Sequence, residues 1–88
     1  MTRPLPSTAT IGAYFDSRLA IVWSGPQGMT RCPFHADHQP SLSLNAEKGV
    51  FFCHGCGAQG GLVEFERLFS RCDLKTARRV IGKLCYGR

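Results

Sequence analysis

Two short stretches, Cys32-Pro33-Phe34-His35 and Cys53-His54-Gly55-Cys56-Gly57, organise the whole chain. Each holds two potential metal ligands with two residues between them, and seventeen residues separate the two pairs. Cys and His side chains paired in this way are typical of a tetrahedral zinc site gripped by two tight turns. We therefore expect one zinc ion bound by Cys32, His35, Cys53 and Cys56. Gly55 and Gly57 are expected to adopt positive φ and so to turn backbone N–H groups toward a thiolate.

The expected site is structural rather than catalytic, because all four ligands come from the protein and none is left for water. Two other histidines compete for the fourth position. His54 lies between two ligands and His38 would need a longer turn, so His35 is preferred. Cys72 and Cys85 are thirteen residues apart and lack a second pair, so they are expected to be small buried hydrophobic residues.

The chain has 88 residues, which is enough for one small domain whose apolar core alone would be marginal. We expect a flexible tail over residues 1–7 and a single zinc-binding domain over residues 8–88. The longest apolar run, Leu19 to Trp23, is too short to span a bilayer, and the Pro-rich start does not resemble a secretory signal. Five cysteines without such a signal indicate a reducing, cytoplasmic location away from membranes.

The formal net charge is +5 and is unevenly distributed. Residues 67–88 contain seven basic side chains against the single acid Asp73, a net of +6, while residues 1–66 contain four basic and five acidic side chains, a net of −1. This asymmetry favours a polyanionic partner, although a basic helical face is also common as a plain solvated surface.

The pattern of the first half predicts one helix and two hairpins. A helix capped by Ser7 or Thr8 is expected to end near Arg18. Residues 19–23 and 29–32 then form one hairpin. Residues 41–45 and 50–53, joined by the loop 46–49, form a second hairpin that brings Cys53 back beside Cys32. The predicted fold class is a small zinc-bound α+β domain with a zinc-ribbon type of antiparallel sheet.

Two helices are expected to follow the second ligand pair. The first opens at Gly60-Gly61 and runs from about Leu62 to Ser70. The last is capped by Asp73 and carries an apolar stripe and a basic face. The predicted stripe consists of Leu74, Ala77, Ile81 and Leu84, and the predicted basic face of Lys75, Arg78, Arg79 and Lys83.

Enzyme chemistry has little support in the sequence. The six acidic side chains are scattered, with no Asp-x-Asp pair for Mg²⁺, no Gly-rich phosphate loop and no nucleophile constellation. We expect this chain alone not to catalyse a reaction.

A resemblance to a known family covers residues 32–69 closely and residues 11–29 more loosely. The matching residues are Cys32-Pro33-Phe34-His35, Asp37, Pro40-Ser41, Lys48, Phe51, Cys53-His54-Gly55-Cys56-Gly57, Gly60 and Val63-Glu64-Phe65. They resemble the zinc-binding domain of DnaG-type DNA primases. The resemblance implies a non-catalytic module that holds single-stranded DNA template for primer initiation during DNA replication. It also implies a primase catalytic domain or polymerase, in cis or in trans, and a replicative helicase as partners.

The resemblance places template contacts on the sheet, at Arg31, His38, Lys48 and Phe51, with phosphate contacts from the basic face of the last helix. Phe51 is a possible stacking platform, but the sequence leaves it equally free to pack beneath the sheet. The chain departs from the family at His38 and Met29, where basic residues are common. Two alternatives stay open: a stand-alone zinc-ribbon regulator that binds duplex DNA, and a protein-interaction module.

Overall fold

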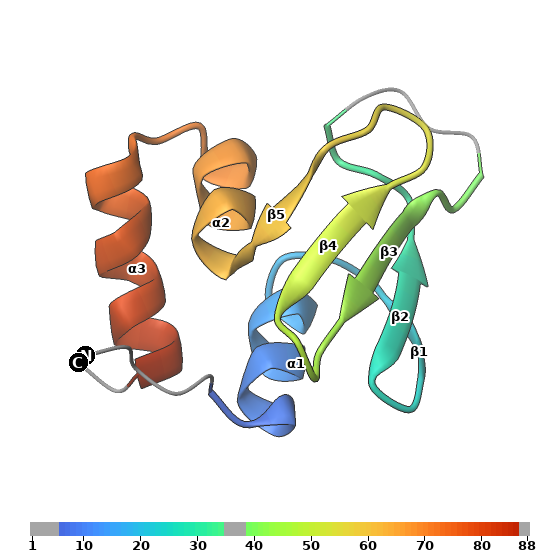
Figure 1. The fold of residues 1–88 in the computed structure, drawn as a ribbon, viewed down its shortest axis with the longest axis horizontal. Helices are drawn as coiled ribbons and strands as arrows, with labels where there is room; N and C mark the ends of the chain where they lie inside the picture. Colours follow the sequence, from blue (N-terminus) through green and yellow to red (C-terminus); the bar gives the residue numbers. More distant parts are fainter. Residues whose placement is uncertain (1–5, 35–38, 87–88) are drawn as a thin grey trace.

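The computed structural model describes residues 6–34 and 39–86, which form a five-stranded antiparallel sheet and three helices. Each strand pairs with the next strand in the sequence, in the order β1-β2-β3-β4-β5. The helices lie on one side of the sheet, and α3 is the farthest from the strands (Figure 1). The elements are α1 (Thr8–Asp16), β1 (Val22–Ser24), β2 (Gln27–Thr30), β3 (Leu42–Asn45), β4 (Val50–Cys53), β5 (Gln59–Gly61), α2 (Leu62–Ser70) and α3 (Leu74–Tyr86).

The two predicted hairpins are present, and they are joined into one sheet because β2 also pairs with β3. The fifth strand was not predicted. Its sequence, Gln59-Gly60-Gly61, lacks the β-branched and aromatic residues that mark a strand, and it pairs with β4 through the backbone. Gly61 is also the N-cap of α2, so the predicted start of that helix at Gly60-Gly61 is confirmed.

The first helix begins where the sequence indicates. The Ser7 hydroxyl accepts a hydrogen bond from the Thr10 backbone N–H at 3.1 Å, which satisfies one of the free donors of the first turn. The strand after it starts at Val22, so the prediction of strand from residue 19 was wrong. The N–H groups of Arg18 and Leu19 donate to the Phe15 carbonyl and extend the helix end as a turn.

Alternation along the strands separates an inner face, toward the helices, from an outer face. Leu42, Leu44, Phe51 and Cys53 are buried on the inner face. The centre of the core is Phe65 of α2, whose ring lies 5.2 to 5.6 Å from three other rings, measured between centroids. Those rings come from three different segments: Phe15 of α1, Phe34 beside Cys32, and Phe51 of β4.

The last helix is capped as predicted but is rotated relative to the expected stripe. The Asp73 carboxylate accepts a hydrogen bond from the Thr76 N–H at 2.8 Å. Ala77 and Ile81 are buried as expected, but Leu74 and Leu84 are exposed, and Cys85 takes the third inward position. Positions 77, 81 and 85 are four residues apart and lie on one face of the helix. Leu84 lies at the margin of this face, and Leu74 is the first residue of the helix.

One buried carboxylate connects α2 with α1 and the turn after it, and the sequence analysis did not predict it. Glu66 of α2 is only 2% exposed, and its carboxylate accepts hydrogen bonds from Tyr14, Arg18 and Ser70. Burial by itself would raise the pKa of Glu66, but the three donors outweigh it and lower the pKa. Burial, together with the Glu66 carboxylate, raises the pKa of the Tyr14 hydroxyl, which therefore stays a donor.

Candidate metal centre and nucleic-acid interface

Three of the four predicted zinc ligands meet at one end of the sheet. Cys32 follows β2, Cys53 ends β4, and Cys56 lies in the turn after β4. Their sulfur atoms all lie within 4.8 Å of one another, and the sulfurs of Cys32 and Cys56 are 3.9 Å apart. Tetrahedral zinc with bonds of about 2.3 Å to sulfur would separate two thiolates by about 3.8 Å. The cluster therefore fits a zinc ion, and Cys32, Cys53 and Cys56 would hold it.

Backbone N–H groups point at two of the sulfurs. The Phe34 N–H donates to the Cys32 sulfur at 3.4 Å, and the N–H groups of Gly55 and Cys56 donate to the Cys53 sulfur at 3.3 and 3.4 Å. Such donors stabilise a thiolate over a thiol. Gly57 adopts φ +80° as predicted, whereas Gly55 is absent from the positive-φ residues of the described chain, so its predicted backbone conformation was wrong.

Without a cation, the Cys32 side chain favours the neutral thiol. Burial raises the pKa of the Cys32 thiol to about 12, and the sulfurs of Cys53 and Cys56 add to the rise. A divalent cation reverses this preference, because its charge stabilises thiolates and proton release accompanies binding.

The choice of the fourth ligand depends on residues outside the described part of the chain. Both His35 and His38 fall in the segment 35–38, so His35 remains a prediction. His54 does not join the sulfur cluster found among the described residues. Its ring lies 3.1 Å from the Ser43 hydroxyl and packs edge-on against Phe52, with the ring centroids 4.8 Å apart. Cys72 and Cys85 also lie outside the cluster, and the preference for His35 over His54 stays a prediction.

The predicted DNA-contact residues occupy separate places rather than one patch. Arg31 is exposed beside Cys32 at the zinc end of the sheet. Lys48 is exposed in the β3–β4 loop at the opposite end, about 10 Å of strand away. The predicted basic face of α3 is exposed on the helix farthest from the strands (Figure 1). His38 lies outside the described residues, and these positions stay predictions for DNA binding.

Phe51 cannot serve as an open stacking platform in this structure. It is 3% exposed and lies on the inner face against Phe34 and Phe65. The neighbouring residue, Phe52, is 38% exposed on the outer face. The sequence contains the signal that decides between them. Cys53 must face the metal, and residues two apart in a strand share a face, so Phe51 points inward and Phe52 outward.

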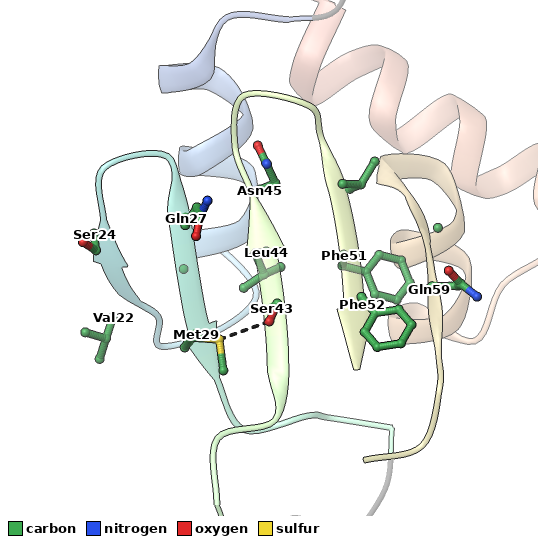
Figure 2. A pocket seen from close by; sticks show the side chains of 13 residues that line it. Val22, Ser24, Gln27, Met29, Ser43, Leu44, Asn45, Phe51, Phe52 and Gln59 are labelled. Atoms are coloured by element: carbon green, nitrogen blue, oxygen red, sulfur yellow. Dashed lines mark hydrogen bonds between the residues drawn. The ribbon is translucent and has the colours of Figure 1, made fainter. Parts of the chain in front are cut away.

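The outer face of the sheet carries a hollow of about 620 Å³ that sequence reasoning missed. A row of side chains crosses all five strands in register at this face, and Figure 2 shows it open toward the viewer, with the helices behind the sheet. None of the described residues that line the hollow is charged. The row consists of Val22, Met29, Ser43, Phe52 and Gln59.

Known proteins match this fold and this cysteine arrangement. The family model described as the CHC2 zinc finger, the zinc ribbon of DnaG, matches residues 3–85. The DNA primase of Helicobacter pylori (strain ATCC 700392 / 26695) is 42% identical over 73 residues, 83% of this chain and 13% of that protein. The DNA primase of Lactococcus lactis is 34% identical over 67 residues, 76% of this chain and 10% of that protein.

A solved structure agrees with the sequence matches. The crystal structure of the zinc-binding and RNA polymerase domains of the Aquifex aeolicus primase aligns with a TM-score of 0.78 at 28% identity. The alignment covers 88% of this chain and 19% of that one, so the chain spans only a small part of its relatives. No helix among the described residues is long and apolar enough to cross a membrane. The match over residues 3–85 shows that the chain belongs to the CHC2 zinc finger family of DnaG-type primases.

Proposed function

We propose that this chain is the zinc-binding, nucleic-acid-binding module of a DNA primase and that it holds single-stranded DNA template for primer initiation. The observation that carries the proposal is the three-sulfur cluster at the end of a sheet whose fold and sequence match primase zinc-binding domains. One structural zinc ion is bound by Cys32, His35, Cys53 and Cys56. The zinc fixes the end of the sheet and takes no part in chemistry, because protein ligands fill its coordination shell.

The surfaces of the domain support template binding. Single-stranded DNA offers flat bases and a charged backbone, and proteins bind it with aromatic platforms beside basic groups. The outer face of the sheet offers Phe52, and Arg31 lies beside the zinc end of the same sheet. The basic face of α3 supplies phosphate contacts that carry no sequence preference.

Four of the five acidic side chains among the described residues have partners of their own, which supports a non-catalytic role. Glu66 is enclosed by three donors, Glu64 pairs with Arg67, and Asp73 caps α3. The Asp16 carboxylate accepts a hydrogen bond from the Trp23 indole at 2.8 Å. The chain with nucleotides, template and Mg²⁺ is therefore expected to make no primer in a gel-based synthesis assay. Primer made by the purified chain alone would overturn this assignment.

Primer synthesis then requires a catalytic partner. We propose a primase catalytic domain or polymerase, in cis or in trans, with a replicative helicase as a further partner. The relatives are DNA primases several times longer than this chain, which supports a catalytic domain elsewhere. The cysteines must stay reduced to bind zinc, and this requirement supports a cytoplasmic location.

Binding of labelled oligonucleotides at two salt concentrations tests the proposal. Tighter binding to single strands than to duplexes, weakening as salt rises, is the expected result. Duplex binding that equals or exceeds single-strand binding would favour the stand-alone regulator. No binding to either probe would leave the protein-interaction module as the better description.

A further inference from the structure

We propose that Phe52 and Gln59 form a reading site for one unstacked base, with the base stacked on the Phe52 ring and its polar edge facing the Gln59 amide. The inference rests on the proposed binding of single-stranded DNA and names the part of the surface that reads sequence. It replaces the prediction that Phe51 has this role, because Phe51 is buried.

The two residues lie side by side on the outer face. Phe52 of β4 and Gln59 of β5 are direct cross-strand partners, a relation that places side chains about 5 Å apart on the same face. Both line the hollow, and Figure 2 shows them on adjacent strands, with the Gln59 amide on the side of β5 away from the Phe52 ring. A base that lies on the ring and extends across β5 would bring its edge to the amide.

Neighbouring contacts hold the ring in place and leave the amide available. The His54 ring packs edge-on against Phe52, and the Ser43 hydroxyl lies 3.1 Å from the His54 Nε2. The Asn45 side-chain oxygen is already committed, since it accepts hydrogen bonds from the N–H groups of Glu47 and Lys48. Gln59 is exposed, and no hydrogen bond joins its amide to another described residue.

The chemistry of the hollow favours a base over the other parts of a nucleic acid. A phosphate needs a cation or a cluster of N–H donors, and no charged side chain lines the hollow among the described residues. A base needs an aromatic face and a group that both donates and accepts, which the Phe52 ring and the Gln59 amide supply. Stacking on the Phe52 ring should accept any base, because every base has a flat face. Hydrogen bonds to the Gln59 amide should discriminate between bases.

Separate leucine variants of the two residues test the inference. Fluorescence anisotropy is measured with labelled dT12, dC12 and dA12 on the zinc-loaded protein, with zinc content and melting midpoint recorded for each variant. Phe52→Leu is expected to weaken binding of all three probes about fivefold or more, with an unchanged slope of log K against log salt. Gln59→Leu is expected to bring the three affinities closer together.

Two matched controls separate this site from general effects. Phe69→Leu changes a half-buried ring of α2 outside the hollow, and it should leave probe affinity unchanged. Gln27→Leu changes an exposed amide of β2 in the other cross-strand row, beside Ser24 and Asn45, and it should leave the ranking of the probes unchanged.

The outcomes distinguish failure of the inference from failure of the proposed function. Normal probe binding by both Phe52→Leu and Gln59→Leu, or equal effects of Gln27→Leu and Gln59→Leu, would overturn the reading site while leaving the template-binding function intact. Absence of binding by the unaltered zinc-loaded protein would overturn the proposed function and the inference with it.

Discussion

The zinc end of the sheet and the helical layer stabilise the same five strands by different means. At the zinc end, three cysteine sulfurs from two turns converge, and burial favours the neutral thiol of Cys32 unless a cation is bound. In the helical layer, Phe65 packs against rings from three other segments, and the buried Glu66 charge already has three donors from protein. The zinc end and the helical layer should therefore fail under different conditions. The zinc end should fail on loss of metal, and the helical layer on loss of packing or of the buried hydrogen-bond acceptor Glu66.

Removal of a zinc ligand should have the largest effect. Cys53→Ser is expected to abolish zinc binding and with it the cooperative unfolding transition, because binding energies for such sites are about 10 to 16 kcal/mol. Metal analysis and thermal unfolding by circular dichroism measure both losses.

The histidines provide the control for this variant. His54→Ala and His38→Ala should both retain one equivalent of zinc, whereas His35→Ala should not. A Cys53→Ser protein that keeps its metal and its sharp transition would show that the site is misassigned.

Removal of the buried carboxylate should have the next largest effect, with the zinc retained. Glu66→Ala leaves the Tyr14 and Ser70 hydroxyls without their acceptor, and we expect a loss of about 2 to 3 kcal/mol in the free energy of unfolding. Chemical denaturation measures the loss. Glu64→Ala is the matched control, because the exposed Glu64–Arg67 pair should contribute less than about 1 kcal/mol. Equal losses from the two variants would mean that burial of Glu66 adds nothing to stability.

Acidification should weaken the helical layer in a way that depends on Glu66. Burial opposes ionisation of this carboxyl, but the donors lower its pKa below the ordinary value of 4.5, so ionised Glu66 stabilises the folded state above that pH. The contribution is lost as pH falls through the lowered folded-state pKa. The gap in unfolding free energy between the unaltered protein and Glu66→Gln should therefore be constant from pH 7 to about pH 5 and narrow below about pH 4.5. Both proteins have the same zinc site, so the pH dependence of zinc binding cancels in this difference. A gap in unfolding free energy that widens in acid would contradict this role of Glu66.

The basic face of α3 should matter least for stability. Lys75→Gln combined with Arg79→Gln is expected to change the free energy of unfolding by less than about 0.5 kcal/mol, because both side chains are exposed. The same variant should weaken oligonucleotide binding equally for all sequences and reduce the salt slope by about 1.4, or about 0.7 per lost contact. The pair Lys75→Arg with Arg79→Lys keeps the charges and should bind normally. A changed sequence preference in the glutamine variant would instead place base reading on the helix.

The sequence predicts features that depend on neighbours along the chain. The Ser7 and Asp73 caps and the bounds of α2 follow from spacing and capping chemistry, and the structure confirms them. The structure also brings together the three cysteines that spacing predicts as ligands, and their role as ligands stays a prediction. Features that depend on distant partners were missed. Glu66 looks like a surface acid in sequence, because two of its donors, Tyr14 and Arg18, lie 52 and 48 residues away.

The remaining misses have local causes. The strand β5 is formed by backbone pairing of a Gln-Gly-Gly segment, which carries no side-chain signal. In α3, Leu84 and Cys85 flank the face through Ala77 and Ile81 on opposite sides, so helical spacing does not choose between them, and the structure buries the cysteine. The orientations of Phe51 and Phe52 can be predicted from the sequence once Cys53 is taken as a ligand, because side chains alternate along a strand.

The sequential strand order has a kinetic consequence. Contacts between neighbours in sequence close short loops and form early, whereas contacts across long stretches form late and slow the overall rate. Every strand pairing in this sheet is of the first kind, while the contacts of α1 with Glu66 are of the second. We therefore expect the antiparallel sheet to form first. The longest loop closed at this stage is the one between Cys32 and Cys53, which closes when the ion binds. Docking of α1 should come last and complete the native state.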